Sequence, residues 1–267
     1  SDRRRTDTRM LAAIVLAGET PGQVDPLAAA VGASRKSLIP IAGRPMVSYV
    51  CDALDAVERI GRIVIVGLSE ADHVTRSAKA VFHPGCGDLL DNVLAAIEWL
   101  KAHEPATEYA VLATSDIPLL TPDVVNTFID MCLTTRHELY YSVVEQSVME
   151  RAYPESGRSF RHFGKQAYAG GDLHLVATHI DVGHIERVRQ ATRSRKSGLA
   201  QAWVLGIPTL VKFALGRLTL DETVAAAQRA LGLHGRAIVS PDAALAMDAD
   251  KPHQLAQVRA ILEALPR

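Results

Sequence analysis

Acidic residues follow two of the apolar runs in this sequence. Asp116 comes directly after one run, and Asp248 and Asp250 follow another run and precede Pro252. A carboxylate at the carboxyl edge of a sheet can hold a divalent cation, and Mg²⁺ prefers one or two carboxylates together with phosphate oxygens. The alternatives are a turn residue at Asp116 and a helix N-cap at Asp250, although a capping carboxylate keeps a second oxygen for a metal.

Two cations follow the first apolar run. Residues 11–17 are continuously apolar and stop at Gly18, which is typical of a strand buried on both faces of a parallel sheet. Arg35 and Lys36 come after a span rich in Gly, Pro and Ala. Ligands of open α/β folds bind at the carboxyl ends of the strands, so these cations could contact one. An ordinary strand with a solvated loop is the alternative.

A second group of polar residues suits a phosphate-bearing acceptor. Four basic side chains crowd one short span: Arg158, Arg161, His162 and Lys165. The alternative for them is a solvated strand face. Gly170 and Gly171, just before Asp172, permit close approach of the backbone to a ligand, or a bulge at the start of a strand.

Composition limits the class of protein. The chain has 267 residues, of which 48% are hydrophobic, so it can bury one large core. A net charge of −1 argues against a general nucleic-acid binder. The three widely spaced cysteines favour a reduced, cytoplasmic setting over a disulfide framework or a Cys-based zinc site. Neither a signal peptide nor a membrane span is expected, because the start is polar and the apolar segment 202–220 is short and interrupted.

Predicted strands and helices alternate along the chain, and they must position these residues. Apolar runs predict strands at residues 11–17, 63–66, 80–83, 109–114, 139–144 and 236–240. Helical spacing predicts helices at residues 46–57, 70–80, 88–100, 178–191, 199–231 and 252–265, and one that begins after an N-cap at Thr121. This alternation predicts a doubly wound, mostly parallel α/β sheet with helices on both faces.

Three segments together resemble the nucleotidyltransferases of the MobA-like (sugar-phosphate nucleotidyltransferase-like) superfamily. They are AIVLAG at 13–18 with KSLIPIAGRPM at 36–46, SDIPL at 115–119, and MDADKPHQL at 247–255. AGGDL at 169–173 is similar to a Gly-Gly-Asn-Leu segment that some members carry before the acceptor site. The resemblance implies a Rossmann-like, GT-A-type domain at 11–267, with an acceptor-side insertion at about 145–235. The polar start of the sequence predicts a flexible tail at 1–10.

The resemblance also implies a Mg²⁺-dependent reaction. A nucleoside triphosphate would bind at the first loop, and a small phosphorylated acceptor (a sugar, polyol or cofactor phosphate) would attack its α-phosphorus in line and release pyrophosphate. The expected catalytic residues are Lys36, which contacts the phosphates, and Asp116 and Asp250, which hold the metal. Most of the rate enhancement in such chemistry comes from positioning the reactants and from neutralising the charge of the phosphates.

The binding residues follow from the same segments. The nucleotide site is expected to include Leu16, Ala17, Gly18, Arg35, Lys36, Gly87, Asp88, Asn92 and Ser115. The acceptor site is expected to include Arg161, Lys165, Gly170, Gly171 and Asp172. The apolar helices expected at 199–231 could form a lid or a homodimer face.

Two departures from the family pattern leave alternatives open. Glu19 stands where relatives have a second glycine, and no arginine lies between Gly18 and Arg35. Either the phosphate cradle is shifted, with Arg35 standing in, or activity is weakened. Asp172 in place of an asparagine leaves the acceptor open.

Two other functions remain to be weighed. One is a GT-A glycosyltransferase that uses a nucleotide-sugar, against which Lys36 and the segment 43–45 argue. The other is a non-catalytic nucleotide-binding regulatory protein, for which Glu19 is the best support.

Overall fold

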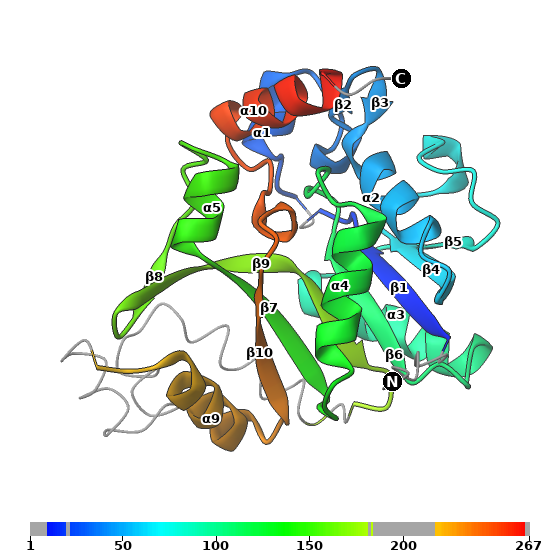
Figure 1. Cartoon of the computed structure of the whole chain (residues 1–267). Helices are drawn as coiled ribbons and strands as arrows, with labels where there is room; N and C mark the ends of the chain where they lie inside the picture. The colour runs from blue at the N-terminus through cyan, green and yellow to red at the C-terminus, as the bar shows by residue number, and fades with distance from the viewer. Residues whose placement is uncertain (1–9, 20–21, 181–182, 184–216, 265–267) are drawn as a thin grey trace, which may run out of the picture.

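The protein is described here from a computed structural model, which places residues 10–19, 22–180, 183 and 217–264. Its main sheet has the strand order β10-β7-β9-β6-β1-β4-β5, and β8 pairs with β9 (Figure 1). The strands are β1 (Leu11–Leu16), β4 (Ile60–Val66), β5 (Ala80–His83), β6 (Tyr109–Thr114), β7 (Leu139–Glu145), β8 (Arg161–Phe163), β9 (Gln166–Ala177) and β10 (Gly235–Ser240). A separate hairpin joins β2 (Pro40–Ile41) to β3 (Arg44–Pro45). The predicted doubly wound, mostly parallel α/β sheet is confirmed.

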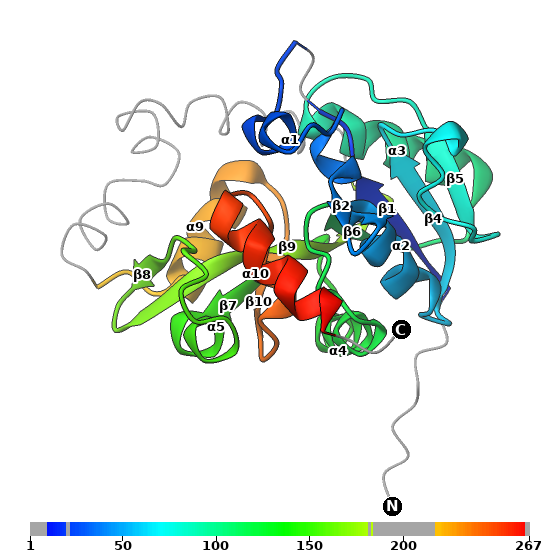
Figure 2. The same cartoon turned by 90° about the horizontal axis from the view of Figure 1, so that it is seen from above.

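Helices cover both faces of this sheet (Figure 2). One face carries α2 (Met46–Asp55), α4 (Pro122–Cys132), α5 (Gln146–Ala152) and α10 (Pro252–Glu263). The other face carries α3 (Leu89–His103) and α9 (Leu220–Leu231). The short helix α1 (Pro26–Ala30) begins at an N-cap, Asp25, whose side chain accepts a hydrogen bond from the Ala28 N–H at 2.9 Å.

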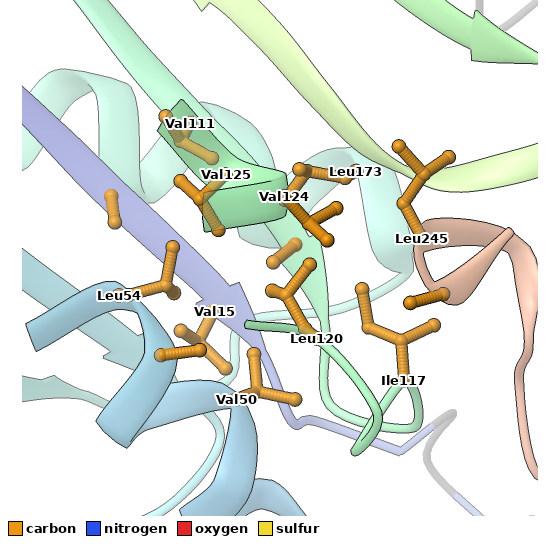
Figure 3. Close-up of a cluster of buried hydrophobic side chains, with 14 of the residues drawn as sticks. Val15, Val50, Leu54, Val111, Ile117, Leu120, Val124, Val125, Leu173 and Leu245 are labelled. Carbon is orange, nitrogen blue, oxygen red and sulfur yellow. The ribbon is translucent and has the colours of Figure 1, made fainter. Parts of the chain in front are cut away.

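The central strand β1 contributes to the hydrophobic core on both sides. Because successive strand residues point to opposite faces, Val15 packs in the cluster that contains α2 and α4, whereas Ile14 packs against α3. Figure 3 shows Val15 beside Val50 and Leu54 of α2. A strand buried on both faces reads as a continuous apolar run, as residues 11–17 do.

One predicted helix is wrong. Residues 70–80 form only the 3₁₀ turn η2 (Glu70–Asp72), followed by irregular chain into β5. The Ser69 and Asp72 side chains close a capping box around this turn, and His73 then takes a left-handed conformation with φ 50°. The segment has no apolar stripe to pack against the sheet, and without such packing a short helix gains little stability.

Parts of other predictions lie outside the described residues. The expected tail at 1–10 is described only at Met10, and the expected helix at 178–191 only in part, where residues 178 and 179 form a turn. Of the expected helix at 199–231, the structure describes the last part as α9. The helix starting after Thr121 is confirmed as α4, with the Thr121 side chain accepting from the Val124 N–H at 3.4 Å.

Strand β9 was not predicted in its full length. It begins at Gln166, runs through Gly170 and Gly171, and is antiparallel to β6, β7 and β8, whereas the other described pairs in the sheet are parallel. Because β9 runs the opposite way, its first half lies at the edge where β6 and β1 end. Its register with β7 shifts opposite Ser142, so that residues 171–173 form a bulge at this edge.

Within the part of the chain that the structure describes, no helix combines the length and apolarity needed to cross a bilayer.

The ends of β1 and β4 meet at Gly67. Its φ is +94°, and a Cβ there would lie 2.3 Å from the Gly18 Cα. We expect Gly67→Ala to lower the free energy of unfolding by about 2–5 kcal/mol, because it combines a backbone clash with left-handed strain. The control Gly32→Ala has φ +70° and open space around the added methyl, so it should cost only about 1–2 kcal/mol. Equal losses for the two variants in urea titrations would contradict this prediction.

Candidate active site

Three carboxylates from two distant segments meet at the carboxyl edge of the sheet. Asp116 follows β6, and Asp248 and Asp250 precede α10. One oxygen from each lies within 4.8 Å of the others. The two segments are joined by a backbone hydrogen bond of 2.9 Å from the Ala249 N–H to the Asp116 carbonyl. The structure therefore brings together the acidic residues that the sequence analysis selected.

Lys36 bridges two of these carboxylates. Its Nζ donates hydrogen bonds to Asp116 Oδ2 and to Asp250 Oδ1. Burial alone would lower the pKa of Lys36, but the attraction of Asp116 and the hydrogen bonds to both carboxylates outweigh it, and the pKa is raised. Burial acts to raise the pKa of Asp250, yet the hydrogen bond from Lys36 lowers it overall. Both shifts favour the charged forms of Lys36 and Asp250.

Arg158 bridges a second pair of carboxylates. Its guanidinium forms an ion pair with Asp248, lies 3.5 Å from Asp172, and donates a 2.7 Å hydrogen bond to the Gly170 carbonyl. The side chains of Arg158 and Asp248 are only 14% and 9% exposed. The predicted cluster of Arg158 with Arg161 does not form, because Arg161 is exposed on β8 whereas Arg158 is half-buried against the acidic segment.

The turn before Arg158 is held by the last helix. Side chains of α10 and its N-cap donate hydrogen bonds of about 3 Å to turn carbonyls: Lys251 to Gly157, Gln254 to Ser156, and Gln257 to Pro154. The buried Gln254 also accepts from the Asp250 N–H at 3.1 Å. The helix N-cap is Lys251, so the N-cap alternative for Asp250 is wrong, and the Asp250 carboxylate faces Lys36 instead.

A cleft of about 320 Å³ leads to this site. It is lined by predicted nucleotide-site residues from the ends of two strands and from the start of α3: Leu16, Ala17, Gly18, Lys36, Gly87, Asn92 and Ser115. Asp116 also lines it. Asp88 instead sits at the N-cap of α3, where its side chain accepts from the backbone N–H groups of residues 90 and 91.

The Glu19 carboxylate contacts the backbone and not the carboxylate cluster. Its Oε1 accepts a 3.0 Å hydrogen bond from the Lys36 N–H and so holds the start of the 3₁₀ turn η1 (Lys36–Leu38). Arg35 lines an adjoining hollow of about 280 Å³ with Gly18, Glu19 and Gly85, and its guanidinium donates to the Gly67 carbonyl. The loop between Gly18 and Lys36 is therefore closed by a side-chain contact that the sequence did not signal.

Two apolar side chains in the cleft were not predicted. Val24 and Leu89 both line it and are 77% and 63% exposed. Large apolar side chains left open to solvent at a cleft commonly contact a ligand. The signal available in the sequence was Leu89 directly after a helix N-cap, where no core contact was required of it.

The predicted acceptor residues do not gather in one place. Arg161 and Gly170 line a separate, apolar cleft of about 510 Å³ between β7 and α9. A Cβ on Gly171 would meet Ser142 and Leu245, and the Asp172 carboxylate lies against Arg158. Strand alternation explains this, because consecutive residues of β9 point to opposite faces. Lys165 is exposed in the turn between β8 and β9.

The surroundings of Asp172 favour the protonated form of its carboxyl group. Burial, followed by the nearby carboxylates of Asp116 and Asp248, raises its pKa to about 8, although Arg158 acts in the opposite direction. A protonated carboxyl has one donor and one free carbonyl acceptor. Its hydrogen-bonding capacity is therefore close to that of the asparagine that the resemblance leads us to expect here.

Comparison with known proteins identifies the class as nucleotidyltransferases. The chain belongs to the MobA-like NTP transferase domain family, which it matches over residues 13–266. No curated protein matches it.

Solved structures agree with this assignment. A hypothetical transferase from Thermus thermophilus is 32% identical, with a TM-score of 0.78 over 92% of this chain and 99% of that chain. The 4-diphosphocytidyl-2C-methyl-D-erythritol synthase of Anaerococcus prevotii is 10% identical, with a TM-score of 0.57 over 96% and 97%. A CMP:2-keto-3-deoxy-manno-octonic acid synthetase complexed with CTP is 12% identical, with a TM-score of 0.57 over 95% and 98%. The latter two likenesses show the shared fold.

Removal of Arg158 should destabilise the protein. Arg158→Met leaves the buried Asp248 carboxylate without its cation, and we expect a loss of about 3–5 kcal/mol in the free energy of unfolding. The control Arg161→Met changes an exposed arginine of β8 and should stay within about 0.5 kcal/mol of the parent protein. Urea unfolding at pH 7 measures both, and similar small losses would show that the Arg158 pair is not important for stability.

Proposed function

We propose that this nucleotidyltransferase transfers a nucleoside monophosphate from a nucleoside triphosphate to a small phosphorylated acceptor in a Mg²⁺-dependent reaction. The observation that carries the proposal is the meeting of Lys36, Asp116 and Asp250 at the end of a cleft lined by Gly18. An acceptor phosphate oxygen attacks the α-phosphorus and forms a new P–O bond. The bond from the α-phosphorus to the bridging oxygen breaks, and pyrophosphate leaves with its electron pair.

The carboxylates present fit a magnesium ion. Asp116, Asp248 and Asp250 offer hard oxygen donors within 4.8 Å of one another, which is the ligand chemistry that Mg²⁺ requires. Asp116 and Asp250 would hold the ion, because Asp248 is already paired with Arg158. When bound, the metal would neutralise charge on the phosphates and polarise the α-phosphoryl group.

Side chains of the protein would position the triphosphate and the nucleobase. Lys36 is the cation placed to contact the triphosphate, and Arg35 in the adjoining hollow is the second candidate, in place of the arginine that relatives carry earlier. Asn92 is buried and fixed, because its Oδ1 accepts a 2.9 Å hydrogen bond from the Cys86 N–H. It is suited to hold the loop at Gly87 beside the nucleobase.

Val24 and Leu89 give the nucleobase an apolar surface. Both are exposed in the cleft, and a base presents flat faces that such side chains can cover. We therefore place the base between α1 and the start of α3. The triphosphate then extends toward Lys36.

The acceptor would approach from the side of β9. Asp172 lies in the bulge of that strand, beside the carboxylate cluster, and its raised pKa favours a protonated carboxyl that can donate or accept a hydrogen bond without repelling a phosphate. We keep residues 145–235 as the acceptor side of the domain; the lid or homodimer face expected at 199–231 lies largely outside the described residues.

The metal pair can be tested by substitution. Asp116→Ala and Asp250→Ala should each reduce pyrophosphate release at least about 100-fold in a screen of nucleoside triphosphates against sugar and polyol phosphates, because each removes a metal ligand. Asp130→Ala, an exposed residue of α4, is the matched control and should keep full activity. Full turnover by both site variants would refute the roles assigned here, and transfer from a nucleotide-sugar without pyrophosphate would indicate the glycosyltransferase alternative.

Leu89 should affect nucleotide binding but not folding. In thermal-shift titrations of the four triphosphates with Mg²⁺, the correct base should give the largest stabilisation, because a ligand stabilises the native state by mass action. Leu89→Ser should weaken binding of that triphosphate by about 5–20-fold through lost apolar contact, while the ligand-free melting temperature stays close to that of the parent. Unchanged affinity would exclude Leu89 from the base site. Leu94→Ser is the control: Leu94 lies on α3 and packs against the core, so this variant should lower the melting temperature.

A further inference from the structure

The site contains two cations, and each bridges two carboxylates. Lys36 joins Asp116 to Asp250, and Arg158 joins Asp248 to Asp172. The two cations are about equally buried, with side chains 16% and 14% exposed, but Asp250 is 54% exposed. The Lys36 cluster therefore reaches solvent through Asp250.

Arg158 is fixed from several directions. Its guanidinium also donates to the Gly170 carbonyl, and the turn that precedes it is tied to α10 through Gln254 and Lys251. A planar guanidinium with several directional partners has little freedom to move. Arg158 is a permanent part of the site.

Among the residues that the structure describes, the charged end of Lys36 contacts fewer partners. Its two hydrogen-bond acceptors are the carboxylates of Asp116 and Asp250, and the ammonium stands on a long flexible stem that also lines the nucleotide cleft. The same carboxylates are the ones assigned above to the metal. The other oxygen of Asp116, Oδ1, accepts from the Thr114 hydroxyl at 2.5 Å. Lys36 therefore occupies carboxylate oxygens that a divalent cation needs.

We propose that the Lys36 ammonium is a built-in competitor of the divalent cation, so that the ion binds tightly only when a triphosphate has drawn Lys36 away from Asp116 and Asp250. This inference rests on the proposed function, because it takes the triphosphate as the alternative partner of Lys36. An ammonium and a divalent cation repel each other at one pair of carboxylates, and the anionic phosphates remove that repulsion. By linkage, the ion and the triphosphate strengthen each other's binding by the same factor.

The experiment measures Mn²⁺ binding to the full chain without nucleotide, by electron paramagnetic resonance of free Mn²⁺ and by calorimetry. Removing the competitor in Lys36→Met should tighten Mn²⁺ binding by about tenfold or more, within the usual range of coupling between two sites. Lys36→Gln should behave in the same way and serves as a second variant if Lys36→Met does not fold. Lys36→Arg keeps the positive charge and should bind Mn²⁺ as weakly as the parent. Lys101→Met, an exposed residue in the last turn of α3, is the matched control and should match the parent.

The outcomes separate this inference from the reaction. Equal or weaker Mn²⁺ binding by folded Lys36→Met and Lys36→Gln would overturn the competitor role. Absence of Mn²⁺ binding from every variant would overturn both this role and the metal site of the proposed function. Tighter binding in the two neutral variants, combined with no pyrophosphate release from the parent protein in any acceptor screen, would uphold the competitor role and refute the proposed reaction.

Discussion

One backbone hydrogen bond, from the Ala249 N–H to the Asp116 carbonyl, determines the geometry of the site. It fixes the loop after β6 against the segment before α10, so the carboxylates on either side of it have to share a small volume. Like charges at such a distance are unfavourable unless cations separate them. The positions of Lys36 and Arg158 follow from this constraint, and both lysine and arginine are found with their charged ends between acidic side chains.

The strand, turn and helix around the site also hold the acidic cluster together. Strand β9 runs against its neighbours, and its bulge places Asp172 at the edge where β6 ends. The turn before Arg158 is tied to α10 by the buried Gln254, which also accepts a hydrogen bond from the Asp250 backbone. Strand, turn and helix thus share one set of contacts. The proposed nucleotide cleft is formed by the ends of β1 and β6 with the start of α3, and it meets this set of contacts at Lys36 and Asp116.

The sequence predicted what local patterns encode. Buried strands read as apolar runs, the Thr121 cap marked α4, and the acids Asp116 and Asp250 were selected because each follows a strand and precedes a turn or helix. What it could not predict depends on tertiary contacts. The Arg158 pairing requires a bulge and a turn from different parts of the chain, and the Glu19 contact requires the loop to fold back on itself. The helix expected at 70–80 failed because helical spacing of polar residues does not supply a face to bury.

The position of α10 has a consequence for how the protein is made. Besides carrying the turn before Arg158, this helix reaches the N-terminal half, where Arg259 donates a 2.9 Å hydrogen bond to the Pro40 carbonyl of β2. The residues that line the cleft all lie before residue 117, so a chain leaving the ribosome contains them long before Asp250 and α10 emerge. Under the proposed function, a chain cut short before Asp250 would lack one of the two carboxylates that hold the metal.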